Sequence, residues 1–356
     1  MISAKLLGRM CVLLLCGLLV GGLWPFHAPR NEVNWLQSHN GLRFGKHGTL
    51  LGSGAFKTSL QEEASVSLEV WLQPSLINAS NLFLTFYTPE SPLQFSLRQY
   101  RAELILRSEF RNEQQQVRAK EAEVEDVFSK EKPSFLTITS SPRGTAVYRD
   151  GVLVKTFPRF RLSNNDIAGQ LVFGSSPVEY DAWSGQLLGL AIYRQELTVA
   201  QVLQHYQSWT EKGRPAITES ERTVALYVFD EHSGTVVHNL VNPGIELQFP
   251  EQFTLVNPIF LGPPSLRNWR DILVNILGFI PVGLLFRSYF AIRQIRRPAL
   301  ATVLLGGMVS LTIEILQVVL PTRGSDMTDV ITNVLGTFVG AMLYRFKAAQ
   351  GLFEKV

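Results

Sequence analysis

The stretch DILVNILGFIPVGLLF, residues 271–286, decides what kind of protein this chain is. It is apolar like a membrane segment, yet it carries an aspartate and an asparagine four residues apart. About 20 such residues span a bilayer as a helix. Residues four apart share one face of a helix, so Asp271 and Asn275 lie together. We therefore expect a membrane helix over 271–290 with a polar stripe, kinked at Pro281, which has no N–H to donate.

Three other segments of the 356-residue chain are similarly apolar, at 6–24, 298–320 and 327–344. Because they lie at the two ends, the averages of 46% hydrophobic residues and net charge +3 hide this layout. The first segment follows Lys5 and fits either an uncleaved anchor or a cleavable signal peptide. We favour the anchor, because the run is long and residues 23–27 offer no small-x-small cleavage site. The sequence thus predicts four transmembrane helices.

Basic residues near these segments set the expected orientation. The turn at 287–297 carries four arginines and no acid, and positive loops stay in the cytoplasm. Lys5 places the N-terminus on the same side, and Arg345 does so for the C-terminus. We therefore expect a multi-pass protein of a bacterial cytoplasmic (inner) membrane, with both termini cytoplasmic and residues 28–268 outside.

The region between the first two helices has the pattern of a soluble β domain. Short runs such as 64–71 and 185–193 alternate apolar and polar residues, and Gly, Asn and Pro separate them. This period-two pattern predicts the antiparallel strands of a sandwich. The charged stretch 107–132 is expected to form a long hairpin or a solvated loop. We expect the sandwich over 28–210, then additional sandwich strands or a β annex with a linker over 211–268.

Three of these runs, in order, resemble laminin-G-like, concanavalin-A-like domains. VSLEVWLQP (66–74) is similar to their opening strand, and AVYRDG (146–151) follows it. WSGQLLGLAIYRQELTVAQVLQHY (183–206) resembles the usual final strand and short helix. The resemblance covers about residues 40–210 and implies a jelly roll inserted between the first two membrane helices. It also implies a glycan, protein or calcium ligand, or a spacer role, without deciding between them.

Calcium binding by this domain stays an open alternative to the expectation of no cofactor. Asp166, Glu179 and Asp181 lie on expected loops, where carboxylates can ligate calcium. Solvated loop carboxylates are more common, and the domain sequence has no dense acidic cluster. Its charges are mixed in sign, so no nucleic-acid partner is expected.

The C-terminal region, 269–356, carries polar residues that a simple anchor does not need. They recur at spacings of three and four on each helix, and the outer turn at 321–326 adds charges at the same level. An ionised Glu facing lipid costs at least about 2.5–3.5 kcal/mol, so Glu314 should face a partner, either Arg323 or a proton. The alternative is that these groups only join helices through hydrogen bonds. The predicted pocket consists of Asp271, Asn275, Glu314, Gln317, Arg323, Asp326, Asp329 and Asn333.

The same residues resemble the VanZ-like family. DILVNILG (271–278), EILQ (314–317) and RGSDMTDVITN (323–333) occur in that order. The resemblance implies a first helix, residues 1–27, then an outer loop that the jelly roll fills, then three helices. It also implies an association with resistance to teicoplanin-type glycopeptide and related lipopeptide antibiotics. The large inserted domain departs from the short members of the family.

Two outward surfaces on one chain favour a non-enzymatic protein of the cell envelope. In this hypothesis the pocket binds a lipid headgroup or a lipid-linked cell-wall precursor, and the jelly roll binds a glycan or a protein. The rival is a membrane enzyme acting on a lipid-linked phosphate or glycan, with the four acids holding a metal and Arg323 clamping phosphate. No nucleophile motif, Gly-rich phosphate loop or His/Cys metal spacing supports the enzyme. The third alternative is an anchored adhesin.

Overall fold

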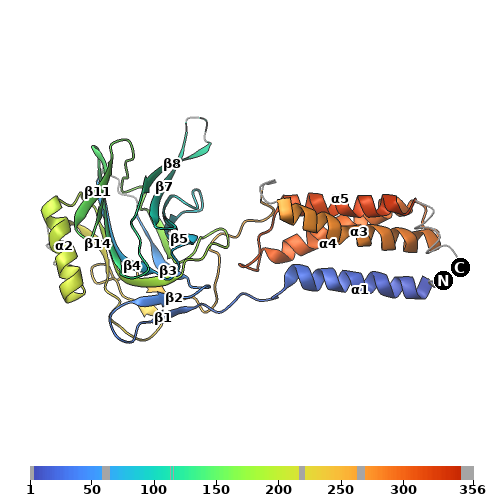
Figure 1. The fold of residues 1–356 in the computed structure, drawn as a ribbon, viewed down its shortest axis with the longest axis horizontal. Coiled ribbons are helices and arrows are strands. Elements are labelled where there is room, and N and C mark those ends of the chain that lie inside the picture. Colours follow the sequence, from blue (N-terminus) through green and yellow to red (C-terminus); the bar gives the residue numbers. More distant parts are fainter. Residues whose placement is uncertain are drawn as a thin grey trace. The chain divides into compact units, whose positions relative to one another are not determined.

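The computed structural model describes residues 4–57, 65–112, 114, 116–215, 221–262 and 269–345. The chain divides into two compact units. One is Pro29–Asn257, which is built mainly from strands. The other joins Met1–Ala28 to Pro258–Val356, and its described part is helical (Figure 1).

In the described part of the first unit, the strands form two antiparallel sheets of eight strands each. The first sheet has the order β1 (Val33–Trp35), β2 (Leu42–Phe44), β13 (Gly185–Tyr193), β4 (Val66–Pro74), β9 (Ser134–Ser141), β10 (Gly144–Arg149), β11 (Val152–Phe157), and β14 (Thr223–Tyr227) pairs with β13. The second has the order β15 (Val236–Val237), β16 (Leu247–Gln248), β3 (Leu50–Phe56), β12 (Gly169–Phe173), β5 (Ser80–Tyr87), β6 (Phe95–Tyr100), β7 (Glu103–Arg111), β8 (Val117–Val124). The predicted β-sandwich is confirmed.

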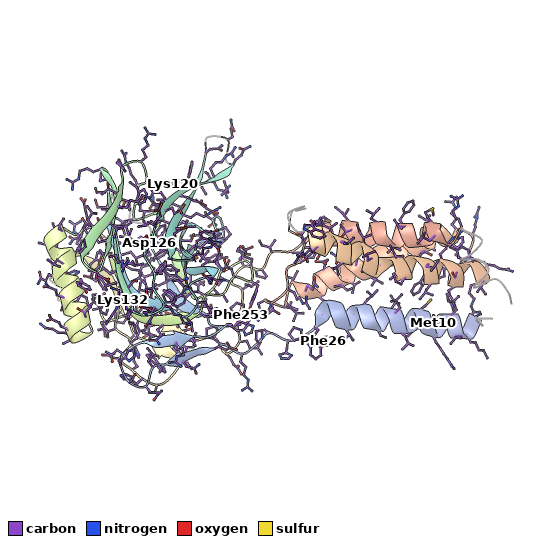
Figure 2. All side chains as sticks on the ribbon, viewed as in Figure 1. Met10, Phe26, Lys120, Asp126, Lys132 and Phe253 are labelled. Atoms are coloured by element: carbon purple, nitrogen blue, oxygen red, sulfur yellow. The ribbon has the colours of Figure 1, made fainter. Side chains whose placement is uncertain are left out.

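Apolar side chains from both sheets fill the space between them (Figure 2). Trp183 lies at the centre of an aromatic group, with its ring 5.9 Å from the rings of both Phe44 and Phe173. Its indole N–H donates to Oε1 of Gln99 at 2.8 Å, so the buried nitrogen keeps a partner. The alternation seen in the sequence is thus the alternation between this core and the outer faces.

Two segments with open expectations become parts of the sheets. The charged stretch 107–132 contributes to a long hairpin, in which β7 pairs with β8. The stretch after residue 210 supplies edge strands to both sheets: β14 pairs with β13, and β16 pairs with β3. The strands of 223–248 therefore complete the sandwich.

Helix α2 (Val199–Lys212) covers the face of the first sheet that points away from the sandwich core (Figure 1). Thr198 and Gln201 close a reciprocal capping box at its start. At its end Gly213 takes a left-handed conformation with φ of 70°, which glycine adopts without a steric penalty. Trp209, fully buried, packs its ring 6.4 Å from the ring of Trp71 on β4.

A buried charge cluster joins α2 to the sheet. Nδ1 of His205 lies 2.9 Å from Oε1 of Glu69 on β4, and both side chains are fully buried. Tyr193 donates its hydroxyl to Oε2 of Glu69 at 2.8 Å, and Trp209 donates its indole N–H to the same oxygen at 3.2 Å. Nε2 of His205 is 3.3 Å from Oε2 of Glu221. Burial alone lowers the pKa of His205, but the hydrogen bond and charge of Glu69, with Glu221 beyond, raise the pKa above its usual value.

This cluster predicts a pH dependence of stability. Because the folded pKa of His205 is raised above the unfolded value of about 6.5, its contribution is fully present below that value and is lost as pH rises through the folded pKa. Thermal unfolding of the full chain in detergent, measured across this range, should show that loss. His205→Gln should unfold with a flatter pH profile, and the exposed control His39→Gln should keep the wild-type one. Parallel profiles for all three proteins would contradict the assignment.

Four apolar helices form the described part of the second unit: α1 (Ala4–Leu23), α3 (Trp269–Ile292), α4 (Pro298–Gln317) and α5 (Met327–Leu343). Of these, α1, α3 and α4 are long and apolar enough to cross a membrane, whereas α5 is a shorter apolar helix. The prediction of four transmembrane helices is therefore corrected to three candidate spans. The reason is length: 17 residues rise about 25 Å, against a hydrocarbon core of about 30 Å. Helix α3 continues through Pro281.

Helices α3 and α5 approach each other backbone to backbone through glycines. A Cβ added at Gly283 would overlap the carbonyl oxygen of Thr337, and one at Gly340 would overlap that of Ile280. Gly336 has the same relation to the backbone of α3. Small residues permit this close packing, which holds the two helices in one register.

The glycine contact predicts a position-dependent effect of adding one methyl group. Gly340→Ala should lower the free energy of unfolding by about 1–3 kcal/mol, because backbone would have to move. Gly278→Ala on α3 is the control, since its Cβ meets nothing within 4 Å. Thermal unfolding of the two full-length variants in the same detergent measures the difference. Equal melting temperatures would show that α3 and α5 are not in this contact.

Candidate functional site

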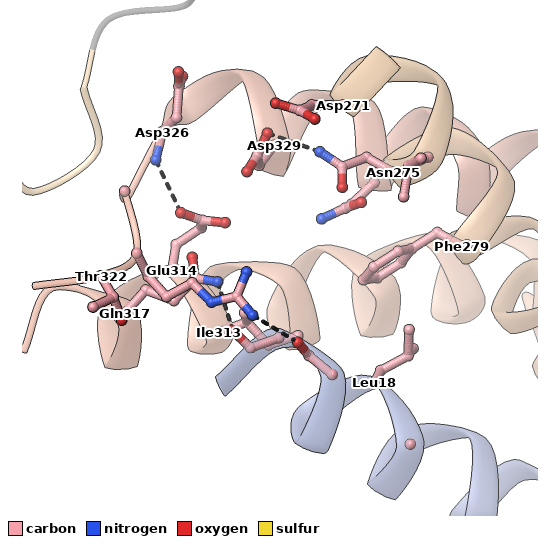
Figure 3. A pocket seen from close by; sticks show the side chains of 18 residues that line it. Leu18, Asp271, Asn275, Phe279, Ile313, Glu314, Gln317, Thr322, Asp326 and Asp329 are labelled. Carbon is pink, nitrogen blue, oxygen red and sulfur yellow. Dashed lines mark hydrogen bonds between the residues drawn. The ribbon is translucent and has the colours of Figure 1, made fainter. Parts of the chain in front are cut away.

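The second unit contains a cavity of about 640 Å³ at the end of the bundle where α1 and α4 finish and α3 and α5 begin (Figure 3). All eight residues of the predicted pocket line it. Three helices and the turn before α5 therefore bring together groups that are up to 62 residues apart in sequence. The lining residues among the eight are Asp271, Asn275, Glu314, Gln317, Arg323, Asp326, Asp329 and Asn333.

The sequence did not reveal the wall that α1 contributes. Gly17, Leu18, Gly21 and Gly22 line the cavity from that helix. A Cβ at Gly17 or Gly21 would meet nothing within 4 Å, so these positions leave the cavity open beside α1. The small-x-x-x-small spacing of Gly17 and Gly21 was the available signal, because it marks a helix face suited to close approach.

Glu314 has a different partner from the one expected. Its side chain is 2% exposed, and Oε2 accepts a hydrogen bond of 2.9 Å from the backbone N–H of Asp326. This N–H lies at the N-terminus of α5, where the helix dipole favours negative charge. Of the two expected partners, Arg323 does not pair with Glu314 in the structure, and the alternative of a proton stays open; the carboxyl group accepts from a helix start instead.

Arg323 donates hydrogen bonds at the C-terminal end of a helix, whereas Glu314 accepts one at an N-terminal end. Its Nε and Nη2 donate to the carbonyl oxygen of Trp24 at 3.1 and 2.9 Å, just beyond the last turn of α1. Gln317 donates its Nε2 to the carbonyl oxygen of Gly22 at 2.8 Å. The last carbonyls of a helix have no partner within it and carry partial negative charge, so a cation and an amide donor suit them. Arg323 and Gln317 together cap α1.

Two further acids surround the start of α5. Oδ1 of Asp326 accepts from the N–H of Thr328 at 2.7 Å and so caps the helix. Oδ1 of Asp329, in the first turn, accepts from Nδ2 of Asn275 on α3 at 2.7 Å. Figure 3 shows Glu314, Asp326, Asp329 and Asp271 around one side of the cavity.

Two amide side chains lining the cavity form hydrogen bonds through their nitrogen but not through their oxygen. Asn333 donates Nδ2 to Oγ of Ser310 at 2.9 Å, which ties α5 to α4. Oδ1 of Asn333 and Oε1 of Gln317 are buried, and neither has a hydrogen-bond partner in the described part of the chain. An unpaired buried acceptor costs about 1–3 kcal/mol, so both oxygens call for a donor.

The structure shows no group of metal-ligating side chains within residues 4–57, 65–112, 114, 116–215, 221–262 and 269–345. No three His, Cys, Asp or Glu side chains there are grouped to hold an ion. The calcium candidates of the sandwich have other partners: Asp166 accepts from the N–H and the hydroxyl of Ser163, both at 2.8 Å, and Asp181 pairs with Arg98 at 2.6 Å. Glu179 is exposed.

A second, smaller cavity lies on the sandwich. It has a volume of about 390 Å³ and is lined by Lys120 and Glu121 of β8 and by residues 156–160. Nζ of Lys120 lies 5.4 Å from the centre of the Phe160 ring (Figure 2 labels Lys120). The surface therefore combines aromatic faces with positive charge.

Comparison with known proteins matches both units. Residues 200–348 match the family model VanZ/LLP1, and residues 51–203 match the concanavalin A-like lectin/glucanases superfamily. Over 78 residues the chain is 42% identical to Protein VanZ of Enterococcus faecium. That match spans 22% of this chain and 45% of the VanZ protein.

Solved structures with similarity to the chain are distant. A SAP-like pentraxin from Limulus polyphemus has a TM-score of 0.36 at 14% identity, covering 63% of this chain and 95% of its own. The binding domain of Paraclostridial Mosquitocidal Protein 1 has a TM-score of 0.39 at 12% identity, covering 51% and 47%. The receptor binding domain of a botulinum neurotoxin C/D mosaic serotype has a TM-score of 0.35 at 14% identity, covering 52% and 48%.

The apolar helices and the VanZ match together indicate a membrane protein. The resemblances found in the sequence are thus confirmed for both units. The chain combines a VanZ-like region in its C-terminal part with a concanavalin A-like domain in its N-terminal half.

Proposed function

We propose that this is a cell-envelope membrane protein whose polar cavity binds a lipid headgroup or a lipid-linked cell-wall precursor. In the same proposal, the concanavalin A-like domain binds a glycan or a protein on the outer side of the membrane. One observation carries it: eight polar residues from three helices and a turn surround one cavity in an otherwise apolar bundle. Ionisable groups in membrane segments are expensive and usually mark a functional site.

The distribution of charge within the bundle supports an outward-facing cavity. Lys5 lies in the first turn of α1, and Arg293 and Arg297 lie between α3 and α4. Leu7 and Tyr344 share one apolar cluster with the end of α3, so these basic residues and Arg345 gather at one end of the bundle. Positive ends stay in the cytoplasm. The cavity, at the opposite end, then faces the outer leaflet.

Exposed aromatic residues near the cavity support a membrane boundary at this level. Trp24 follows α1 and Trp269 begins α3, and both side chains are more than 60% exposed. Phe26 and Phe260 are exposed as well. Tryptophan is enriched where headgroups meet the hydrocarbon. A cavity at this depth is within reach of lipid headgroups.

Both connections to the sandwich leave the bundle at the cavity. Trp24, just after α1, accepts hydrogen bonds from Arg323, and Gly262 exchanges backbone hydrogen bonds with the start of α5, as donor to Ser325 and acceptor from Met327. This connectivity supports an extracytoplasmic sandwich over about 28–268 in our proposal. The groove between Phe157 and Phe160, flanked by Lys120, is the surface where we expect its ligand.

The VanZ match gives the proposal its physiological setting. We infer that the protein contributes to resistance to glycopeptide or lipopeptide antibiotics, as the VanZ-like resemblance implies. Since the match covers 45% of the VanZ protein, the inference concerns the shared membrane region. A ligand cavity at headgroup level suits a role at the membrane surface.

Cysteine labelling tests the orientation. Cys11 and Cys16 are the native cysteines and are replaced by serine first. In intact spheroplasts, a membrane-impermeant maleimide should label Ser233→Cys on the sandwich, and should label Gln294→Cys only after permeabilisation. The reverse pattern would turn the cavity toward the cytoplasm and overturn the proposed lipid site.

Filling the cavity tests the binding site. Gly278 lines the cavity and a Cβ there meets nothing within 4 Å, so Gly278→Leu should fold and occupy the space. We expect its content of specifically co-purified lipid, measured by mass spectrometry on the full chain, to fall at least about tenfold, which is 1.4 kcal/mol of lost contact. Gly278→Ala is the matched control and should retain the lipid. Equal lipid content in both variants, at equal melting temperature, would remove the cavity from the proposal.

A further inference from the structure

Three acids around the cavity, Glu314, Asp326 and Asp329, offer far more acceptor positions than the described residues fill. An ionised carboxylate only accepts, and it has about four lone-pair positions. Glu314 receives the N–H of Asp326 and a hydrogen bond from the Ser325 side chain. Asp326 receives the N–H of Thr328, and Asp329 receives one amide hydrogen of Asn275. These four donors leave most of the acceptor positions on the three acids open.

The amide of Gln317 presents a further acceptor. Its Nε2 donates to the carbonyl oxygen of Gly22, which can only accept, so the orientation of the amide is fixed. Oε1 is therefore the other end of a side chain that lines the cavity, is 8% exposed and has no partner for this oxygen among the described residues. Asn333, 6% exposed, has an unpartnered oxygen as well. Two buried acceptor oxygens thus have no hydrogen-bond donor among the described residues.

The described residues supply no cationic partner to three of the acids around the cavity, Glu314, Asp326 and Asp329. Arg323 is the basic residue of the lining, and its guanidinium is used by the carbonyl of Trp24. In the described chain, no Lys, Arg or His nitrogen lies within ion-pair distance of Glu314, Asp326 or Asp329. Like charges held together in a low dielectric repel, and a bound cation relieves that repulsion. A bound phosphate, which is negative, would add to the repulsion between the acids.

We propose that the cavity binds the primary ammonium group of its ligand, and not a phosphate or another anion. An ammonium group carries one positive charge and three N–H donors, which match the open acceptors of the carboxylates and of Gln317. This assignment rests on the proposed function and names the chemistry of its ligand. The volume of about 640 Å³ exceeds the roughly 30 Å³ of one water, so the site holds more of the ligand than the ammonium group.

The glycines of the wall provide the space for that remainder. Gly17, Gly21 and Gly278 line the cavity, and a side chain at any of them would extend into open space. The ammonium group then lies against α4 and the start of α5, where Glu314, Asp326 and Asp329 are, and the rest of the ligand lies beside α1 and α3. An aminated lipid headgroup and an amine-bearing cell-wall precursor both have this division.

Binding of lipids that differ only at the amine tests the inference. The full chain is titrated in detergent with short-chain phosphatidylethanolamine, with its N-acetylated derivative, which keeps the phosphate but not the ammonium charge, and with phosphatidylglycerol. We expect phosphatidylethanolamine to bind at least about tenfold more tightly than the other two. Glu314→Gln and Asp329→Asn should each bring this ratio toward one. Thr312→Val, on the exposed face of α4, should leave it unchanged.

A soluble arm distinguishes the sources of the amine. Competition by millimolar lysine amide as strong as that by phosphatidylethanolamine assigns the site to an amine outside a lipid. Competition by the lipid alone assigns it to an aminated headgroup. Melting temperatures identify a variant that does not fold, and Asp329→Asn then carries the test in place of Glu314→Gln.

Different binding results would overturn the ammonium assignment and the proposed lipid cavity. Equal binding of the three lipids by the wild type, abolished in each case by Gly278→Leu, overturns the ammonium assignment and leaves the lipid cavity intact. Tighter binding of phosphatidylglycerol overturns the assignment too. Binding that is the same in the wild type and in Gly278→Leu overturns the cavity itself.

Discussion

The polar end of the bundle depends on the unpaired backbone groups of two helix ends. The carbonyls that close α1 and the N–H groups that open α5 have no partners within their own helices, and lipid supplies none. Arg323 donates to a carbonyl at the end of α1, and Glu314 accepts from an N–H at the start of α5. Because these ends carry opposite partial charges, the basic residue and the acids separate instead of pairing. The acidic character of the cavity is a consequence of that separation.

The sequence pointed to the residues that line the cavity, but not to their hydrogen-bond partners. Spacings of three and four on the helices singled out six polar residues, and the turn before α5 added Arg323 and Asp326; all eight line one cavity. Of the two partners expected for Glu314, Arg323 contacts the end of α1 instead. Residue types suggest a charge pair, whereas the unpaired backbone groups of a helix end appear only once the helices are packed. The contribution of α1 was missed for a related reason: Gly17 and Gly21 have no chemistry of their own, and they matter through the space they leave.

In the sandwich, too, contacts between residues distant in sequence were not predictable. Alternating runs predicted the strands and the resemblance predicted their architecture, yet pairing such as that of β14 with β13 depends on contacts distant in sequence. Glu69 is the sharpest case. It looks like an ordinary polar residue in an apolar strand, but α2 covers that face and buries it fully against His205. A buried charge of this kind is tolerated because Tyr193 and Trp209 donate to the same carboxylate.

The glycine contact between α3 and α5 divides the bundle into a fixed part and an adjustable part. Where backbone touches backbone, as at Gly340, even one methyl group has no place to go. The wall on α1 has room for added atoms at Gly17 and Gly21. Diversification of ligand preference within this architecture should therefore proceed through α1, whose side chains can grow into the cavity without disturbing the framework that holds the acids.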